Sequence, residues 1–164
     1  MVAPTMDELL SRYAQKGKVE WIGLRPKRRE PLVVVNQVKA IAGKGLEGDH
    51  AMEKKKVSKR QVTLIMIEHL ASAASVLGVQ AIDPNLLRRN IVVSGINLQS
   101  LKDKRFKIGE AELELTSECH PCSRMEENLG HGGYNAMRGH GGWCAIVLND
   151  GVIKTGDAIG VEES

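Results

Sequence analysis

The sequence predicts a mostly β protein with a few helices, folded into a strongly curved or closed β-barrel. Many short apolar segments of strand character alternate with turns, and only a few stretches have a helical pattern. The 164 residues, 42% of them hydrophobic and 26% charged, suffice for one compact domain and are too few for two. Aromatic residues make up only 3% of the chain, so aliphatic side chains must fill the core.

The chain begins with a helical signal. Thr5 and Glu8 have the spacing of a capping box, in which a hydroxyl and a carboxylate each accept a hydrogen bond from a free backbone N–H at the start of a helix. Gly17 marks the expected end of this region. We therefore divide the chain into an N-terminal helical extension, residues 1–18, and a single barrel domain, residues 19–164.

Strands and helices alternate in the first part of the barrel domain. The expected strands are residues 19–24, 32–40, 62–67 and 91–93. Residues 68–77 form an alanine-rich helix closed by Gly78, and Asp83-Pro84 opens another helix with proline at its first position. Basic residues dominate 25–29, which we interpret as a loop, and 51–60, which we interpret as a solvated segment.

Beyond residue 100 the pattern is mostly β. Residues 105–108 and 113–117 form an expected hairpin around Gly109, and 143–148 is the most apolar strand. Asn149-Asp150-Gly151 is a strong turn signal, and 158–161 is the last expected strand.

Composition narrows the classes of partner and the compartment. The net charge of +3 is weaker than a phosphate-binding surface usually shows, and the few aromatic rings argue against stacking of nucleic-acid bases. No apolar run is long enough to cross a bilayer, and the N-terminus lacks the pattern of a secretory signal. Three cysteines, an odd number, fit a reducing compartment. We expect a cytoplasmic protein without a membrane or nucleic-acid partner.

Cys122 is the candidate reactive residue. It precedes Ser123 and Glu126, which have capping-box spacing, so we expect Ser123 to cap a helix. A thiol at a helix N-terminus lies near the positive end of the helix dipole, and Arg124 adds a full positive charge. Both favour the thiolate, which binds soft metals or acts as a nucleophile. Cys144, within an apolar strand, is expected to be a core residue.

Other site types have weaker support. Cys119 and Cys122 have C-x₂-C spacing and His120, His131 and His140 are nearby in sequence, so structural zinc stays open, although a second closely spaced ligand pair is lacking. The letters G-x-G-x-x-G begin at Gly43, but no apolar helix follows them as a dinucleotide site requires. No G-x-S-x-G hydrolase motif occurs.

An ordered set of short motifs resembles the MOSC domain, which is named for the C-terminal part of molybdenum cofactor sulfurase. The resemblance covers about residues 19–162, and it implies a barrel of the pyruvate-kinase-barrel-like type. The motifs are Gly45-Leu46-Glu47-Gly48-Asp49, Arg60-Gln61-Val62, Arg88-Arg89-Asn90-Ile91, Ile108-Gly109, Pro121-Cys122, Gly141-Gly142 and Gly156-Asp157. One departure is His50, which follows Asp49 where the family commonly has arginine.

The resemblance implies binding of the molybdenum cofactor (molybdopterin), with Cys122 as both the metal ligand and the catalytic residue. It also implies that Arg88 and Asn90 hold the cofactor, and Arg60 falls on a family motif. Arg124, beside the thiol, completes the set of cofactor-binding residues that we expect. A thiolate suits molybdenum, and guanidinium groups suit the cofactor's phosphate.

The expected activity is the reduction of small N-hydroxylated compounds by a molybdenum-dependent oxidoreductase, as in similar small bacterial members. The alternative is a sulfur carrier or cofactor-delivery module in which Cys122 holds a persulfide without redox turnover. Larger relatives carry aminotransferase-like or iron–sulfur domains that these residues do not include. We therefore expect separate electron-donor proteins or a sulfur donor, and independence from pyridoxal phosphate.

Overall fold

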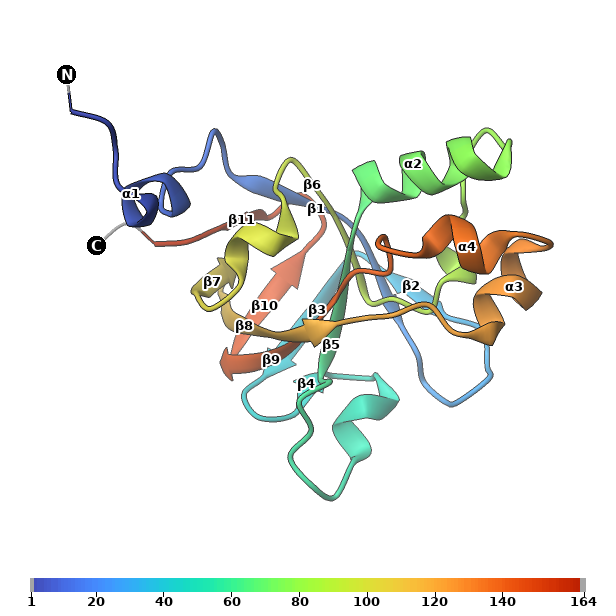
Figure 1. Ribbon diagram of the computed structural model, residues 1–164. Coiled ribbons are helices and arrows are strands. Elements are labelled where there is room, and N and C mark those ends of the chain that lie inside the picture. The colour runs from blue at the N-terminus through green and yellow to red at the C-terminus, as the bar shows by residue number, and fades with distance from the viewer. Residues whose placement is uncertain (1, 163–164) are drawn as a thin grey trace.

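The computed structural model describes residues 2–162, and its centre is a closed, mixed β-barrel of seven strands (Figure 1). The barrel strands, in the order in which they pair, are β11 (Ala158–Gly160), β7 (Arg105–Ile108), β8 (Ala111–Glu118), β9 (Trp143–Asn149), β5 (Val62–Met66), β6 (Ile91–Ser94) and β1 (Gly17–Leu24). Pairing of Gly17 with Ile159 closes the ring between β1 and β11. β5 and β6 run parallel, and their neighbours pair antiparallel. This confirms the predicted fold class.

A smaller sheet lies beside the barrel. It contains β10 (Gly151–Lys154), β3 (Gln37–Ile41) and β4 (Gly45–Leu46), while β2 (Val33–Val35) extends the large sheet from β1. The single strand expected over 32–40 is therefore wrong. Asn36 separates β2 from β3, and the two strands pair with different sheets.

Within residues 2–162 the structure has four α-helices. They are α1 (Met6–Leu10), α2 (Ile67–Leu77), α3 (Ser123–Leu129) and α4 (Gly133–Met137), and the 3₁₀ turns are η1 (His50–Glu53), η2 (Pro84–Leu86) and η3 (Leu98–Leu101). Figure 1 shows α2, α3 and α4 together on one side of the barrel, and α1 on the other side near the chain ends. Among the described residues, no helix has the length and apolar character to cross a membrane.

The predicted caps are partly confirmed. The capping box of Thr5 and Glu8 forms at the start of α1, but the helix ends at Leu10 because none of its residues is buried against the barrel. Gly78 ends α2 with a left-handed φ of 73°, as predicted. The helix expected after Asp83 is a single 3₁₀ turn, η2.

Two apolar layers hold the fold together. One fills the barrel interior, where Leu64 and Val93 lie fully buried. The other lies between the barrel wall and the helices, and it contains Ile65 and Val92 from the same two strands. Alternate residues of β5 and β6 thus face opposite layers, and burial on both faces explains why these strands are apolar throughout. The second layer fixes α3, which begins just after Cys122.

Candidate functional site

Cys122 lies at the start of α3 with its thiol exposed to solvent. It is itself the N-cap residue of the helix, so the prediction that Ser123 caps α3 is wrong. The physical reason lies in Glu126. Its carboxylate accepts hydrogen bonds from the backbone N–H groups of Gly132 and Tyr134, both at 3.0 Å, and therefore holds the entry to α4 instead of completing a capping box.

Three arginines lie within electrostatic reach of one another, and one of them, Arg124, is the second residue of α3. The guanidinium group of Arg88 lies within the electrostatic reach of Arg25 and Arg124, and its partial burial together with their positive charge lowers its pKa. Arg88 donates hydrogen bonds to the carbonyl groups of Glu30 at 2.6 Å and Lys27 at 3.2 Å. These bonds leave other N–H groups of its five free for an anion. Two residues assigned to cofactor binding, Arg88 and Arg124, thus lie close together.

Arg88 also has an unusual backbone. Its φ is 56°, in the left-handed region that side chains other than glycine rarely adopt. Such strain is retained where the surrounding structure requires a particular side-chain position. Here that position is beside Arg25 and Arg124.

Asn90 is buried, with no exposed surface, and its side chain is used inside the protein. Its carbonyl oxygen accepts hydrogen bonds from the backbone N–H and the hydroxyl of Thr63, at 3.1 and 3.2 Å. Its amide group donates to the carbonyl oxygen of Gly23 and to Oδ1 of Asp49, both at 3.0 Å. The structure therefore places Asn90 behind the site rather than at its surface.

Asp49 connects Asn90 to the arginine cluster. Its carboxylate accepts from the Arg25 side chain at 3.2 and 3.1 Å, and from the Arg25 backbone at 2.7 Å. Burial alone would raise the pKa of Asp49, but the hydrogen bonds and charge of Arg25 outweigh it and lower that pKa. His50 contacts the carbonyl oxygen of Arg25 through its ring Nδ1, at 3.0 Å. Asn90 and Asp49 together fix the position of Arg25.

A second group of side chains surrounds the other two cysteines. Sγ of Cys119 lies 2.7 Å from Sγ of Cys144, and both are free thiols. The positive charges of Arg60 and Arg89 act on both thiols. Arg60, expected at the cofactor, is thus placed beside this pair. Cys144 is buried as predicted, but its contact with Cys119 could not be anticipated from the apolar strand that contains it.

The segment that carries Cys122 is held by a close backbone approach at Gly141 and Gly142. The N–H of Cys119 donates to the carbonyl oxygen of Gly142 at 2.8 Å, and Nε of Arg89 donates to that of Gly141 at 2.8 Å. A Cβ atom on Gly141 would overlap the backbone carbonyl oxygen of Cys119. The family motif Gly141-Gly142 therefore has a steric reason in this chain.

Replacing Gly141 by alanine is expected to displace residues 119–122 and to lower the free energy of unfolding by about 2 kcal/mol, a typical cost of overpacking. Urea denaturation measures the change. Gly160→Ala is the matched control, because a Cβ atom there meets only the Lys16 side chain at 3.5 Å. Equal stability of the two variants would contradict the steric role of Gly141.

The described residues 2–162 contain no group of three or more His, Cys, Asp and Glu side chains that could hold a metal ion. His140 instead packs its ring against that of His69, with 4.8 Å between the ring centres. The zinc alternative therefore gains no support from the arrangement of Cys119, Cys122 and the histidines.

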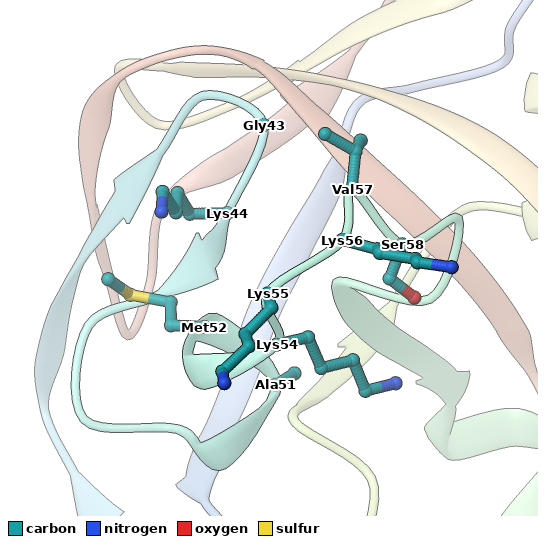
Figure 2. Close-up of a pocket in the computed structure, with 9 residues that line it drawn as sticks. All are labelled: Gly43, Lys44, Ala51, Met52, Lys54, Lys55, Lys56, Val57 and Ser58. Carbon is teal, nitrogen blue, oxygen red and sulfur yellow. The ribbon is translucent and has the colours of Figure 1, made fainter.

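A hollow in the basic loop after β4 has no comparable organisation. Its lining residues are Gly43, Lys44, Ala51, Met52, Lys54, Lys55, Lys56, Val57 and Ser58. Figure 2 shows the ammonium groups of the four lysines pointing in different directions rather than toward one point. They do not form a cradle for a single anion, and we assign this hollow no function.

Two features of the site were not predicted. The sequence predicts Arg25 as part of a basic loop, and the structure pairs it with the buried Asp49. Arg89 lies in a predicted motif, and the structure gives it a contact of its own, with the carbonyl oxygen of Gly141. No local sequence pattern indicates the pairing of Arg25 with Asp49. The two residues are 24 positions apart in sequence, and only the fold brings them together.

Comparisons with known proteins agree with this architecture. Residues 44–160 match the MOSC domain family. The YuaD protein from Bacillus subtilis has a similar structure, with 23% identity, a TM-score of 0.73, and coverage of 88% of this chain and 94% of that chain. YiiM from Geobacillus stearothermophilus has 15% identity and a TM-score of 0.70, covering 90% of this chain and 75% of that chain. YiiM from Escherichia coli has 17% identity and a TM-score of 0.66, covering 90% and 70%.

None of the curated proteins matches this chain. At these identities the solved structures establish a common fold. The family match spans most of the chain and includes Cys122, Arg88 and the Gly141-Gly142 pair. The chain belongs to the MOSC domain family.

Proposed function

We propose that this protein binds the molybdenum cofactor through Cys122 and reduces small N-hydroxylated compounds. The observation that carries the proposal is the exposed Cys122 thiol at the start of α3, the helix whose second residue, Arg124, acts electrostatically on Arg88. When bound, the cofactor supplies a molybdenum centre that accepts and donates electrons in pairs.

The residues present fit this group by their chemistry. The Cys122 thiolate is a soft donor suited to molybdenum, and its exposure leaves room for a bulky pterin. A single protein thiolate would be compatible with a cofactor that brings dithiolene sulfurs of its own. Arg88 and Arg124 provide N–H donors for a phosphate group, to which guanidinium groups bind in pairs of hydrogen bonds.

The remaining residues position these groups. Asn90 holds Asp49, Asp49 holds Arg25, and Arg25 stands beside Arg88. In this proposal Asn90 is a positioning residue, whereas Arg88 and Arg124 contact the cofactor. Arg60 contributes positive charge near Cys119, which lies three residues before Cys122.

The proposed reaction takes an R–NH–OH substrate, two electrons and two protons to R–NH₂ and water. The electrons come from separate donor proteins, which a chemical reductant can replace in the test. Protein is co-expressed with the cofactor pathway, purified without oxygen and incubated with reduced viologen and a hydroxylamine or N-hydroxylated base. Formation of the amine above the level of cofactor-free protein is the expected result.

Absence of amine formation by cofactor-loaded protein would contradict the reductase proposal. Because an exposed thiol also suits sulfur transfer, the same preparation is assayed for a persulfide on Cys122. A persulfide without amine formation would favour the carrier function instead.

Replacing Arg88 by glycine tests its contact with the cofactor. Glycine accepts the φ of 56° without strain, which offsets the loss of two hydrogen bonds, so we expect the free energy of unfolding to change by less than about 1 kcal/mol. Loss of a charge-assisted contact should weaken cofactor binding by roughly tenfold or more.

The matched control is Arg29→Gly, because Arg29 is exposed and has a left-handed φ of 68°. Molybdenum retention on dilution and gel filtration compares the two variants. Equal retention would remove Arg88 from the cofactor-binding set.

A further inference from the structure

The contact between Cys119 and Cys144 lies outside the proposed cofactor site. Cys119 follows the end of β8, and Cys144 is the second residue of β9, the neighbouring antiparallel strand. A register shift between Leu115 and Ser117 brings Cys144 opposite Ser117. The two sulfur atoms then lie 2.7 Å apart, so that movement of less than about 1 Å brings them to the bonding distance of a disulfide.

The surroundings favour ionisation of the pair. The contact with Cys119 and the positive charges of Arg60 and Arg89 lower the pKa of Cys144, and the same contact raises the pKa of Cys119. A thiolate is the form that attacks disulfides.

The two thiols differ in access. Cys144 is 2% exposed, whereas Cys119 is half-buried and lines a hollow together with His120, Pro121 and Trp143. A small oxidant therefore reaches Cys119 first, and the buried partner lies in position to displace it. Accessible and resolving thiols are arranged in this way in redox-sensitive pairs.

We propose that Cys119 and Cys144 are a redox modification site that forms a reversible intramolecular disulfide, separate from Cys122. The oxidant is a low-molecular-weight disulfide such as oxidised glutathione. The Cys119 sulfur attacks it as its proton passes to the adjacent Cys144 thiolate, one glutathione thiolate leaves, and a mixed disulfide forms. Cys144 then loses this proton to solvent. The Cys144 sulfur then attacks Cys119 and expels the second glutathione. The protein loses two protons and two electrons, and the glutathione disulfide gains them as two thiols.

This bond would join the end of β8 to β9 covalently, three residues before Cys122. It would restrict the segment that presents the Cys122 thiol. Formation of this disulfide does not require the molybdenum cofactor, since both cysteines belong to this chain.

Cofactor-free full-length protein is titrated with oxidised glutathione, quenched with acid, denatured, and its free thiols are alkylated and counted. We expect the count to fall from three to one, with the loss of two hydrogen atoms from the mass and no bound glutathione. Trypsin cleavage after lysine and arginine then yields peptides 108–124 and 139–154, joined until a reductant separates them.

Variants assign the bond. Cys122→Ser should still lose two thiols and should still yield the joined peptides, which excludes a bond between Cys122 and Cys144. Cys119→Ser should yield no joined peptides. The proposal is overturned if wild-type protein keeps three thiols, if the bond lies within peptide 108–124, or if Cys122→Ser fails to join the two peptides.

Discussion

Replacing Asn90 by alanine is expected to lower the free energy of unfolding by about 3 kcal/mol or more. The side chain is fully buried and makes four hydrogen bonds, to Thr63, Gly23 and Asp49. Its removal leaves buried donors and acceptors unpaired, and each such group costs about 1–3 kcal/mol. Urea denaturation at an unchanged m-value measures the loss.

Asn85 provides the matched control. It is exposed, and its side chain bonds only to the neighbouring Asp83 at 2.9 Å. We expect Asn85→Ala to stay within about 0.5 kcal/mol of wild type. If Asn90→Ala were equally mild, the buried network would not hold the site together, and a direct cofactor contact for Asn90 would regain support.

The second large effect concerns Cys122. Cys122→Ser should lower the reduction of N-hydroxylated compounds by more than about 100-fold, since removal of even an outer partner of a metal ligand costs 10- to 100-fold. The thiol is exposed, so the free energy of unfolding should change by less than about 0.5 kcal/mol. Steady-state assays with a chemical reductant and urea denaturation measure the two quantities.

Cys119→Ser, assayed under reducing conditions, is the control variant. It shows whether activity depends on Cys122 in particular or is lost when another thiol is removed. We expect it to keep most of the activity, because Cys119 contacts Cys144 rather than the proposed cofactor site. If both variants lost the same activity, the loss would reflect a disturbed structure of residues 119–122 rather than the absence of a metal ligand at Cys122.

Local sequence patterns predict the strands of the barrel well. Turn residues bound short apolar segments, and apolar side chains are needed wherever a strand is buried on both faces, as in β5. The separate small sheet was missed because the break at Asn36 has no glycine or proline to mark it. α4 was missed because it starts at Gly133 after a run of glycines, which resembles a turn.

Local sequence patterns predict the candidate site less well, because its contacts join segments that are far apart in the sequence. Glu126 has the spacing of a capping-box residue, yet its carboxylate accepts hydrogen bonds from the backbone N–H groups of Gly132 and Tyr134. Asn90 has the family pattern of a cofactor residue, yet the fold buries it behind Asp49. Cys119 and Cys144 meet only through a bulge in the register of β8 and β9.

Ligation of the cofactor by Cys122 is tested most directly by the molybdenum content of protein co-expressed with the cofactor pathway and purified without oxygen. We expect close to one molybdenum per chain in wild type and in Cys119→Ser, and almost none in Cys122→Ser. Molybdenum retained by Cys122→Ser, or its absence from wild-type protein, would contradict ligation of the cofactor by Cys122.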